Sequence, residues 1–334
     1  MSCPRMERER AEEFIIGPYG ILSRNSKGRL SPEPECEIRT CFQRDIDRIT
    51  HSKSFRRLKH KTQVFLQPEG DHYRTRLTHT LEVSRLARTV ARALKLNEDL
   101  AEAASLGHDL GHTPFGHAGE RALNAIYPGG FKHYEQSLRV VDILERDGRG
   151  LNLCYETRMG ILHHTHGEAD DTPEAVAVRL CDRIAYINHD LDDSIRAGII
   201  KAEEVPEIIR KNCGERNSER INSLLTDLIE NSSGGKLQMS PKMQEVFDFF
   251  HSYMYSDVYT NPLAKGEESK VEGILALLFE YYVLHPEKLP EDFRSIIDGE
   301  GVERAACDYI SGMTDSYAME KYGELFIPFA WTVK

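Results

Sequence analysis

The feature that most constrains the fold is a helical hydrophobic periodicity that places histidine and aspartate among apolar residues. Three segments show it most clearly: 76–94, 97–111 and 172–198. Each carries a candidate metal-binding side chain on its apolar face, namely His79, His108 and Asp182. Asn97 is suited to cap the second helix and Gly111 to end it. The pattern predicts helices packed face to face, with polar groups pointing into the packed centre.

Strand signals are few, since only residues 61–70 alternate enough to predict a short hairpin. We therefore predict an all-α fold, a helical bundle with a C-terminal helical lobe. The expected parts are an N-terminal arm (1–40), a core (41–200) and a lobe packed on that core (201–334). Apolar and aromatic stretches in the lobe, FDFFHSYMYSDVY and LALLFEYYVL, are typical of a core or a subunit interface.

Composition narrows the cellular compartment and the binding partners that are expected for the chain. No apolar run approaches the roughly 20 residues that span a bilayer, and the charged N-terminus lacks a signal-like apolar block. The seven cysteines are scattered without a CxxC pair, which is typical of free thiols in a cytoplasmic protein. A net charge of −11 argues against nucleic acid as the main partner. The basic run 51–61 is either a solvated helix face or a local site for an anion.

The stretch LGHDLGHTPFGHAGE holds the densest set of possible metal ligands. His108 and Asp109 end one predicted helix, while His79 and Asp182 lie on the faces of two others. Each residue alone has an ordinary structural explanation, but nine of the 14 histidines fall between His79 and His189. We therefore predict one divalent metal ion held by His79, His108, Asp109 and Asp182, with open positions. Mn, Mg, Fe, Co, Ni or Zn would suit these mixed ligands.

Glycine and proline in the same stretch predict a turn that folds back over the metal. His112 and His117 would then lie near a substrate. Glu120 follows His117 by three residues, so the two could touch on a new helix turn. Such a pair is typical of general acid–base catalysis, and the alternative is a simple pairing at a helix N-terminus.

Several blocks in the same order carry a resemblance to a known family. They are QRDIDRITHSKSFRRLKHKTQVF, RTRLTHTLEVSRLAR, GHDLGHTPFGHAGE, FKHYEQSLRV, CDRIAYINHDLDD and DYISGMTDSYAM. The chain resembles the bacterial deoxyguanosine triphosphate triphosphohydrolase-like family of HD-domain phosphohydrolases from roughly Pro18 to Tyr317. An isolated HD pair is a weak signal, whereas HDLGHxPFGHxGE with its flanking blocks is specific.

The resemblance implies an HD-domain helical bundle that hydrolyses dNTPs to the deoxynucleoside and inorganic triphosphate. The residues matched to catalysis are His117, Glu120, His112 and His133. The phosphate-binding matches are Arg76, Lys61, Arg57 and Arg183; those near the sugar are Gln63 and Asp190 at the 3′-hydroxyl and Tyr186 against the deoxyribose. The family also implies a homo-oligomer, often a hexamer.

The chain departs from the family where FEHN is usual, because Lys132 and Tyr134 replace the acid and the amide. This puts phosphate contacts and nucleotide preference in doubt. Another HD phosphohydrolase, acting as a nucleotidase or phosphodiesterase, is an alternative enzyme. His163, His164 and His166 could suggest a second metal, although support of the first site or simple packing is the simpler reading. A dNTP-responsive oligomer with weak catalysis is an alternative of another class.

Overall fold

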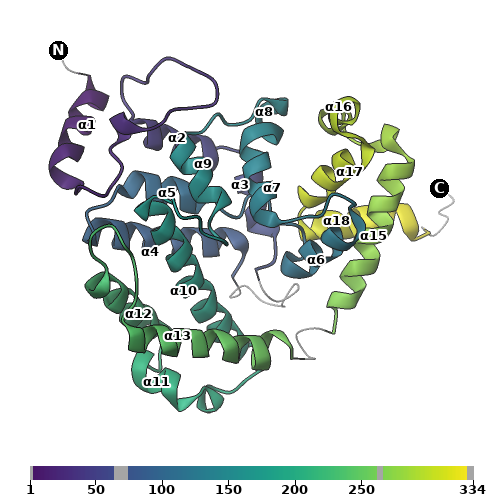
Figure 1. The fold of residues 1–334 in the computed structure, drawn as a ribbon. Helices are drawn as coiled ribbons and strands as arrows, with labels where there is room; N and C mark the ends of the chain where they lie inside the picture. The colour runs from purple at the N-terminus through teal and green to yellow at the C-terminus, as the bar shows by residue number, and fades with distance from the viewer. Residues whose placement is uncertain (1–2, 64–73, 262–265, 329–334) are drawn as a thin grey trace, which may run out of the picture.

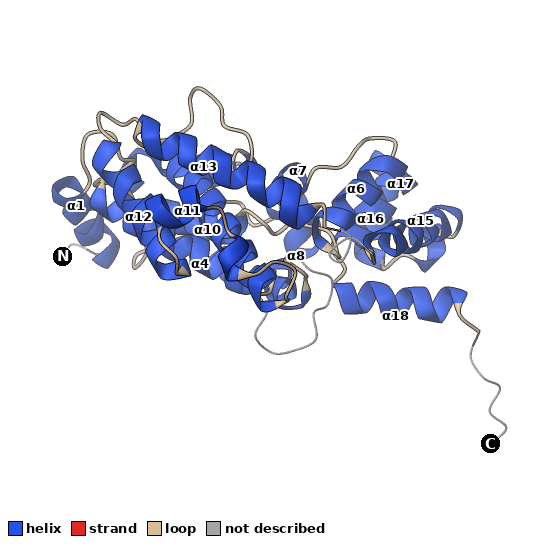
Figure 2. Ribbon diagram, turned by 90° about the horizontal axis from the view of Figure 1, so that it is seen from below, coloured by secondary structure: helices blue, strands red, loops and turns tan. Residues whose placement is uncertain are grey.

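The structure is a computed structural model that describes residues 3–63, 74–261 and 266–328. It confirms the all-α prediction, since these residues form helices joined by turns and loops (Figure 2). Thr62 and Thr75 form an isolated antiparallel bridge at the start of the predicted hairpin. The rest of that hairpin, from residue 64, lies outside the described residues.

The first half of the chain contributes helices up to residue 196. They are α1 (Pro4–Ile15), α2 (Cys41–Thr50), α3 (Lys53–Arg57), α4 (Arg76–Ala93), α5 (Glu98–Gly107), α6 (Gly116–Ile126), α7 (His133–Arg139), α8 (Glu145–Gly148), α9 (Tyr155–Leu162) and α10 (Pro173–Arg196). Short 3₁₀ turns cover Ser23–Asn25 and Leu58–His60, and a π-helical turn covers Val140–Leu144.

The second half continues with α11 (Glu207–Cys213), α12 (Asn217–Asn231), α13 (Pro241–Tyr253), α15 (Glu268–Leu284), α16 (Glu291–Glu300), α17 (Val302–Ser311) and α18 (Asp315–Phe326). A π-helical turn at Met254–Tyr259 follows α13, and 3₁₀ turns lie at Ala202–Glu204 and Pro286–Lys288.

The predicted helix boundaries hold with one difference. Asn97 caps α5, because its side chain accepts hydrogen bonds from the backbone N–H groups of Asp99 and Leu100 at 3.0 and 3.2 Å. However, α5 ends at Gly107 rather than Gly111. The chain then tightens into turns closed by short-range bonds such as His112 N to Asp109 O at 3.1 Å. The HD pair therefore lies on this turn.

The helices pack around two main hydrophobic cores. In the first, α4, α5 and α10 cross one another, and α11 to α13 close over them with side chains such as Leu224, Phe247 and Phe250. In the second, α15 packs against α6, α17 and α18 through Leu275 and Leu278. Figure 1 shows α15 to α18 gathered on the side opposite α1 and α12. Residues after 201 thus divide between both cores, and the three-part division at 40 and 200 stays a prediction.

The remaining predictions concern membrane-spanning helices, the cysteine thiols and the oligomeric state. Among the described residues, no helix is both long and apolar enough to cross a membrane. Among the described residues, Cys36, Cys41, Cys154, Cys181, Cys213 and Cys307 are free thiols. On α15, Leu277 and Leu284 are 38% and 66% exposed, which leaves apolar surface on one side of the helix. The homo-oligomer stays a prediction.

Candidate active site

Three helices bring the four predicted metal ligands to one point. His79 comes from α4, His108 and Asp109 from the turn after α5, and Asp182 from the middle of α10. The Nε2 atom of His79 lies 3.0 Å from Asp182 Oδ1, and His108 Nε2 lies 3.7 Å from that oxygen and 3.5 Å from Asp109 Oδ2. Ligand atoms of His79, His108 and Asp109 all lie within 4.8 Å of one another, a spacing that could hold a metal ion.

The orientation of His108 fits a metal ligand. Its Nδ1 lies 2.6 Å from the carbonyl oxygen of Ser105, which can only accept, so Nδ1 carries the proton. In the neutral ring, Nε2 then carries a lone pair that faces two carboxylates. Among the described residues, no donor makes a hydrogen bond to this nitrogen. A cation between these groups would satisfy all of them. The residues present therefore fit a divalent ion.

The acidic ligands are held in their charged form. Burial alone would raise the pKa of Asp182, but the hydrogen bond from His79 and the nearby imidazoles bring it to about 2. Burial also opposes ionisation of Asp109, while His108 and the Arg76 guanidinium hold its pKa well below the usual range. Arg76 donates from Nη1 to Asp109 Oδ2 at 2.8 Å. Arg76 was predicted to bind phosphate, and here it both lines the cavity and fixes a candidate ligand.

The turn after the HD pair depends on the absence of a side chain at Gly111. A Cβ atom built there would lie 2.1 Å from the backbone nitrogen of Ser137 and 2.3 Å from the carbonyl carbon of Gln136, both in α7. Ser137 Oγ accepts from Gly111 N at 2.9 Å and donates to His108 O at 2.6 Å. The backbone of the HD turn thus touches α7 directly.

Gly111→Ala should therefore lower the free energy of unfolding by ~1–3 kcal/mol or more, since α7 or the turn must shift. Thermal denaturation followed by circular dichroism measures the effect. Gly273→Ala is the matched control, because a Cβ atom there in α15 would point into open space. It should stabilise the helix by roughly 0.5–1 kcal/mol. Equal melting temperatures for the Gly111 variant and the wild type would contradict the packing argument.

A second cluster of imidazoles surrounds Glu120 in α6. Its carboxylate accepts from His117 Nδ1 at 3.2 Å and from His133 Nδ1 at 2.9 Å, and the backbone N–H of His133 donates to it at 2.9 Å. Burial would raise the pKa of Glu120, but these hydrogen bonds from His117 and His133 hold it far below the usual range. The predicted His117–Glu120 pair is therefore in contact, and Glu120 also orients a second histidine.

His112 lies between the two clusters. Its ring stacks on His133 with centroids 4.7 Å apart. Burial, helped by Arg76, holds the pKa of His112 well below its usual value, so the ring is neutral. Within the described part of the chain, neither of its nitrogens has a hydrogen-bond partner. A buried imidazole with two unsatisfied nitrogens is suited to contact a ligand.

From its sequence context, His164 is expected only to support the first metal site or to pack. Its Nδ1 lies 2.7 Å from Ile161 O, and its Nε2 lies 3.1 Å from Nε2 of His133. Burial lowers the pKa of His164 to about 3, so the ring is neutral and accepts from His133. His133 is therefore fixed at both nitrogens, by Glu120 and by His164. His163 instead turns to Asp171. Nothing in the HH pair itself distinguishes the two residues.

A cavity of about 780 Å³ opens beside these clusters. The predicted residues that line it are Gln63, Arg76, His79, Asp109, His112, His117, Glu120, His133, Asp182, Arg183, Tyr186 and Asp190. Lys132 and Tyr134, which depart from the family pattern, also line it. Lys61 and Arg57 instead bond to backbone carbonyls and border another hollow. The structure thus brings most of the predicted site together and keeps these two cations out of it.

The same cavity also offers hydrogen-bond acceptors. Asp190 accepts from the Tyr259 hydroxyl, and burial raises the pKa of Asp190 to about 8. Over residues 3–63, 74–261 and 266–328, its Oδ1 and the Oε1 of Gln63 have no donor. Tyr259 and His251 also line the cavity. The sequence did not single them out, since they come from a π-helical turn and a helix far along the chain. Two open acceptors suit a hydroxyl group of a ligand.

Two family models match the chain: an HD domain over residues 76–187 and a phosphohydrolase-associated domain over residues 237–324. The first match covers all four candidate metal ligands. The chain is 51% identical to the deoxyguanosinetriphosphate triphosphohydrolase-like protein of Caldanaerobacter subterraneus subsp. tengcongensis, over 97% of this chain and 96% of the relative.

A protein of the same name from Desulfatibacillum aliphaticivorans is 45% identical, over 97% of this chain and 98% of that one. Another from Clostridium perfringens strain SM101 is 46% identical, over 96% of both. Among solved structures, a hypothetical protein from Aquifex aeolicus is 21% identical with a TM-score of 0.46, over 85% of this chain and 68% of that one.

Proposed function

The chain belongs to the family of deoxyguanosinetriphosphate triphosphohydrolase-like proteins and is an HD-domain phosphohydrolase, and from this premise we propose that it hydrolyses deoxynucleoside triphosphates to the deoxynucleoside and inorganic triphosphate. The observation that carries the proposal is the set of side chains that line one cavity. Arg76, several imidazoles and three of the four candidate metal ligands share it with two side-chain oxygens that have no donor among the described residues, Asp190 Oδ1 and Gln63 Oε1.

Arg76 and the imidazoles that line the cavity suit a phosphate chain. A divalent ion held by His79, His108, Asp109 and Asp182 would supply Lewis-acid chemistry at a phosphate oxygen. Arg76 and the unsatisfied nitrogens of His112 face the same space. Phosphoryl transfer depends mainly on positioning and charge neutralisation, which these groups can provide.

The His117–Glu120 pair suits proton transfer. Nδ1 of His117 is held by Glu120, so Nε2 is the nitrogen left to exchange a proton with a substrate oxygen. The His117 side chain is 66% exposed, which leaves it room to reach a bound ligand. His133, fixed at both nitrogens, orients Glu120 from the other side. We assign proton transfer to the leaving 5′-oxygen to Nε2 of His117, and the stabilisation of the charged ring to Glu120.

The two oxygens without a donor suit a deoxyribose. A sugar 3′-hydroxyl could donate to Asp190 Oδ1 or Gln63 Oε1. Tyr186 lines the same cavity, and its ring would pack against the sugar near C2′. A 2′-hydroxyl would then have to displace this ring, which favours deoxynucleotides over ribonucleotides.

We expect metal-loaded protein to convert dNTPs into deoxynucleosides and inorganic triphosphate. Incubation with each of the four dNTPs and rNTPs, followed by ion-exchange chromatography, measures this directly. Release of a nucleoside monophosphate with pyrophosphate would show that the bond between the α- and β-phosphates is broken instead of the bond to the 5′-oxygen. Hydrolysis of nucleoside monophosphates or cyclic nucleotides alone would favour the nucleotidase or phosphodiesterase alternative. A change of assembly with dNTP but without turnover would favour the dNTP-responsive oligomer.

A further inference from the structure

The turn between α17 and α18 belongs to the motif DYISGMTDSYAM. The proposed reaction assigns no role to this motif. Asp315 stands at the first position of α18 and is only 3% exposed. Its Oδ1 accepts from the backbone N–H of Phe115 at 2.8 Å, and its Oδ2 accepts from the backbone N–H of Thr62 at 2.9 Å and from the Thr62 hydroxyl. One carboxylate thus joins two segments that are 200 and 253 residues away in the chain.

Both segments lead into the cavity. Phe115 ends the loop that carries His112, and His117 follows two residues later; we call residues 108–117 the catalytic loop. Thr62 immediately precedes Gln63, whose side chain lines the cavity. The bonds of Asp315 therefore hold two segments of the cavity wall in place relative to each other.

Phe115 needs this support because its backbone is strained. Its φ is +63°, in the left-handed region that non-glycine residues seldom adopt. It is the N-cap of α6, and its own side chain makes no capping hydrogen bond. The first N–H groups of a helix have no partner within the helix and need acceptors elsewhere. Asp315 supplies an external acceptor for the Phe115 N–H, so the conformation that aims His117 depends on a residue 200 positions away in the chain.

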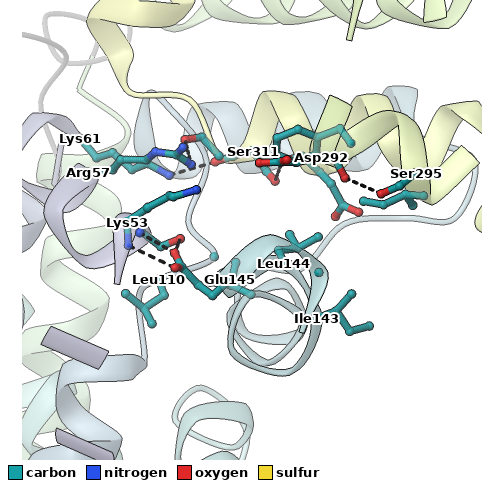
Figure 3. A pocket seen from close by; sticks show the side chains of 18 residues that line it. Lys53, Arg57, Lys61, Leu110, Ile143, Leu144, Glu145, Asp292, Ser295 and Ser311 are labelled. Carbon is teal, nitrogen blue, oxygen red and sulfur yellow. Dashed lines mark hydrogen bonds between the residues drawn. The ribbon is translucent and has the colours of Figure 1, made fainter. Parts of the chain in front are cut away.

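A second contact holds the middle of the catalytic loop. The buried Lys61 ammonium donates to the carbonyl oxygens of His112 and Ser311, the latter at 2.9 Å. Arg57 donates to Gly312 O at 3.1 Å. Figure 3 shows Lys61 and Arg57 side by side next to Ser311. These cations satisfy carbonyls at the C-terminal end of α17, where positive charge is favoured.

We propose that Lys61, Thr62 and the turn 311–315 form a clamp that holds the catalytic loop in its reactive geometry, with Asp315 as the central positioning residue. This inference rests on the proposed function for its kinetic consequences. Its structural content, namely that Asp315 determines the conformation at Phe115, stands apart from any substrate. Of the basic residues that the resemblance matched to phosphate, Lys61 thus acts through the backbone of the loop and Arg57 through the backbone of Gly312.

Asp315→Asn tests the clamp, since the amide keeps the shape of the side chain but presents an N–H₂ group to one of the donors. We expect kcat on a dNTP to fall roughly 10- to 100-fold, because a misplacement of about 1 Å costs about that much. KM should change less than about threefold and the metal content per chain should stay unchanged. Asp292→Asn, an exposed residue in the first turn of α16, is the control for the loss of one negative charge and should match the wild type.

Hydrogen exchange supplies the readout that does not need turnover. The amides of Phe115 and Thr62 should exchange at least about tenfold faster in Asp315→Asn. Amides in the middle of α4 and α5 should keep their protection. Unchanged exchange at Phe115 and Thr62 would overturn the clamp, as would a lower melting temperature with kcat per folded molecule equal to that of the wild type. If wild-type protein hydrolyses no dNTP, the proposed function fails, and the exchange experiment still judges the clamp.

Asp315→Glu covers the case in which Asp315→Asn does not fold. It keeps the charge and both acceptors but moves the carboxylate by one methylene. We expect correct folding, faster exchange at Phe115 and a kcat reduced by about tenfold. Wild-type exchange together with wild-type kcat in this variant would overturn the proposal.

Discussion

Asp182→Asn should lose the bound metal ion and at least ~10³ of the turnover of a dNTP. The Oδ1 atom of Asp182 faces both candidate imidazole ligands, at 3.0 Å from His79 and 3.7 Å from His108. The amide would remove the negative charge that links them. Loss of about 4 kcal/mol of charge stabilisation in the transition state corresponds to ~10³ in rate.

The measurement pairs metal content with turnover. Wild-type protein, purified after loading with a single divalent metal, should carry one ion per chain by elemental analysis, and the variant should carry far less than one. Asp170→Asn, which changes an exposed aspartate in the loop before α10, should keep both metal and activity. A variant that retains one ion and normal turnover would show that the centre does not depend on Asp182. A second ion per wild-type chain would revive the two-metal alternative.

There is a physical reason why the four candidate metal ligands could be grouped from the sequence. Helical periodicity determines which side chains share a face, and the apolar faces of α4, α5 and α10 must pack together. His79 and Asp182 lie on those faces, so packing the faces also brings the two residues together. The specific HD block then located His108 and Asp109. The all-α fold follows from the same periodicity and is confirmed.

Other parts of the site could not be predicted because no periodic pattern links their members. Asp315 meets Phe115 across 200 residues, and Lys61 meets Ser311 across 250. Tyr259 reaches Asp190 from a π-helical turn after α13. Lys61 was predicted to bind phosphate because it lies in a basic run. The sequence of such a run does not show where each side chain points. Only the packing of the second core shows that its charge points to backbone carbonyls.

Prediction from the sequence also fails to distinguish adjacent residues of the same type. His163 and His164 are neighbours, yet a helix end rotates their side chains apart. His164 enters the buried cluster, while His163 pairs with Asp171 at 2.5 Å. Composition and spacing treat the pair alike, so the role of His164 depends on the exact end of α9.

Glu120→Gln should lower kcat on a dNTP by roughly 10²- to 10³-fold while leaving the metal content unchanged. The carboxylate accepts three hydrogen bonds, from the side chains of His117 and His133 and from the backbone of His133. A glutamine can satisfy only part of them, because its N–H₂ group turns a donor toward an imidazole. It also removes the negative charge that stabilises a charged His117 ring during proton transfer.

This variant separates proton transfer from metal binding. None of the four candidate metal ligands is altered, so elemental analysis should give the wild-type value and KM should change less than about threefold. Glu135→Gln, at an exposed position in α7, is the matched control and should behave as the wild type. Wild-type kcat in Glu120→Gln would exclude the His117–Glu120 pair from the reaction. A loss of metal in Glu120→Gln would place Glu120 among the groups that maintain the metal centre, and proton transfer would then have to be assigned to another imidazole in the cavity.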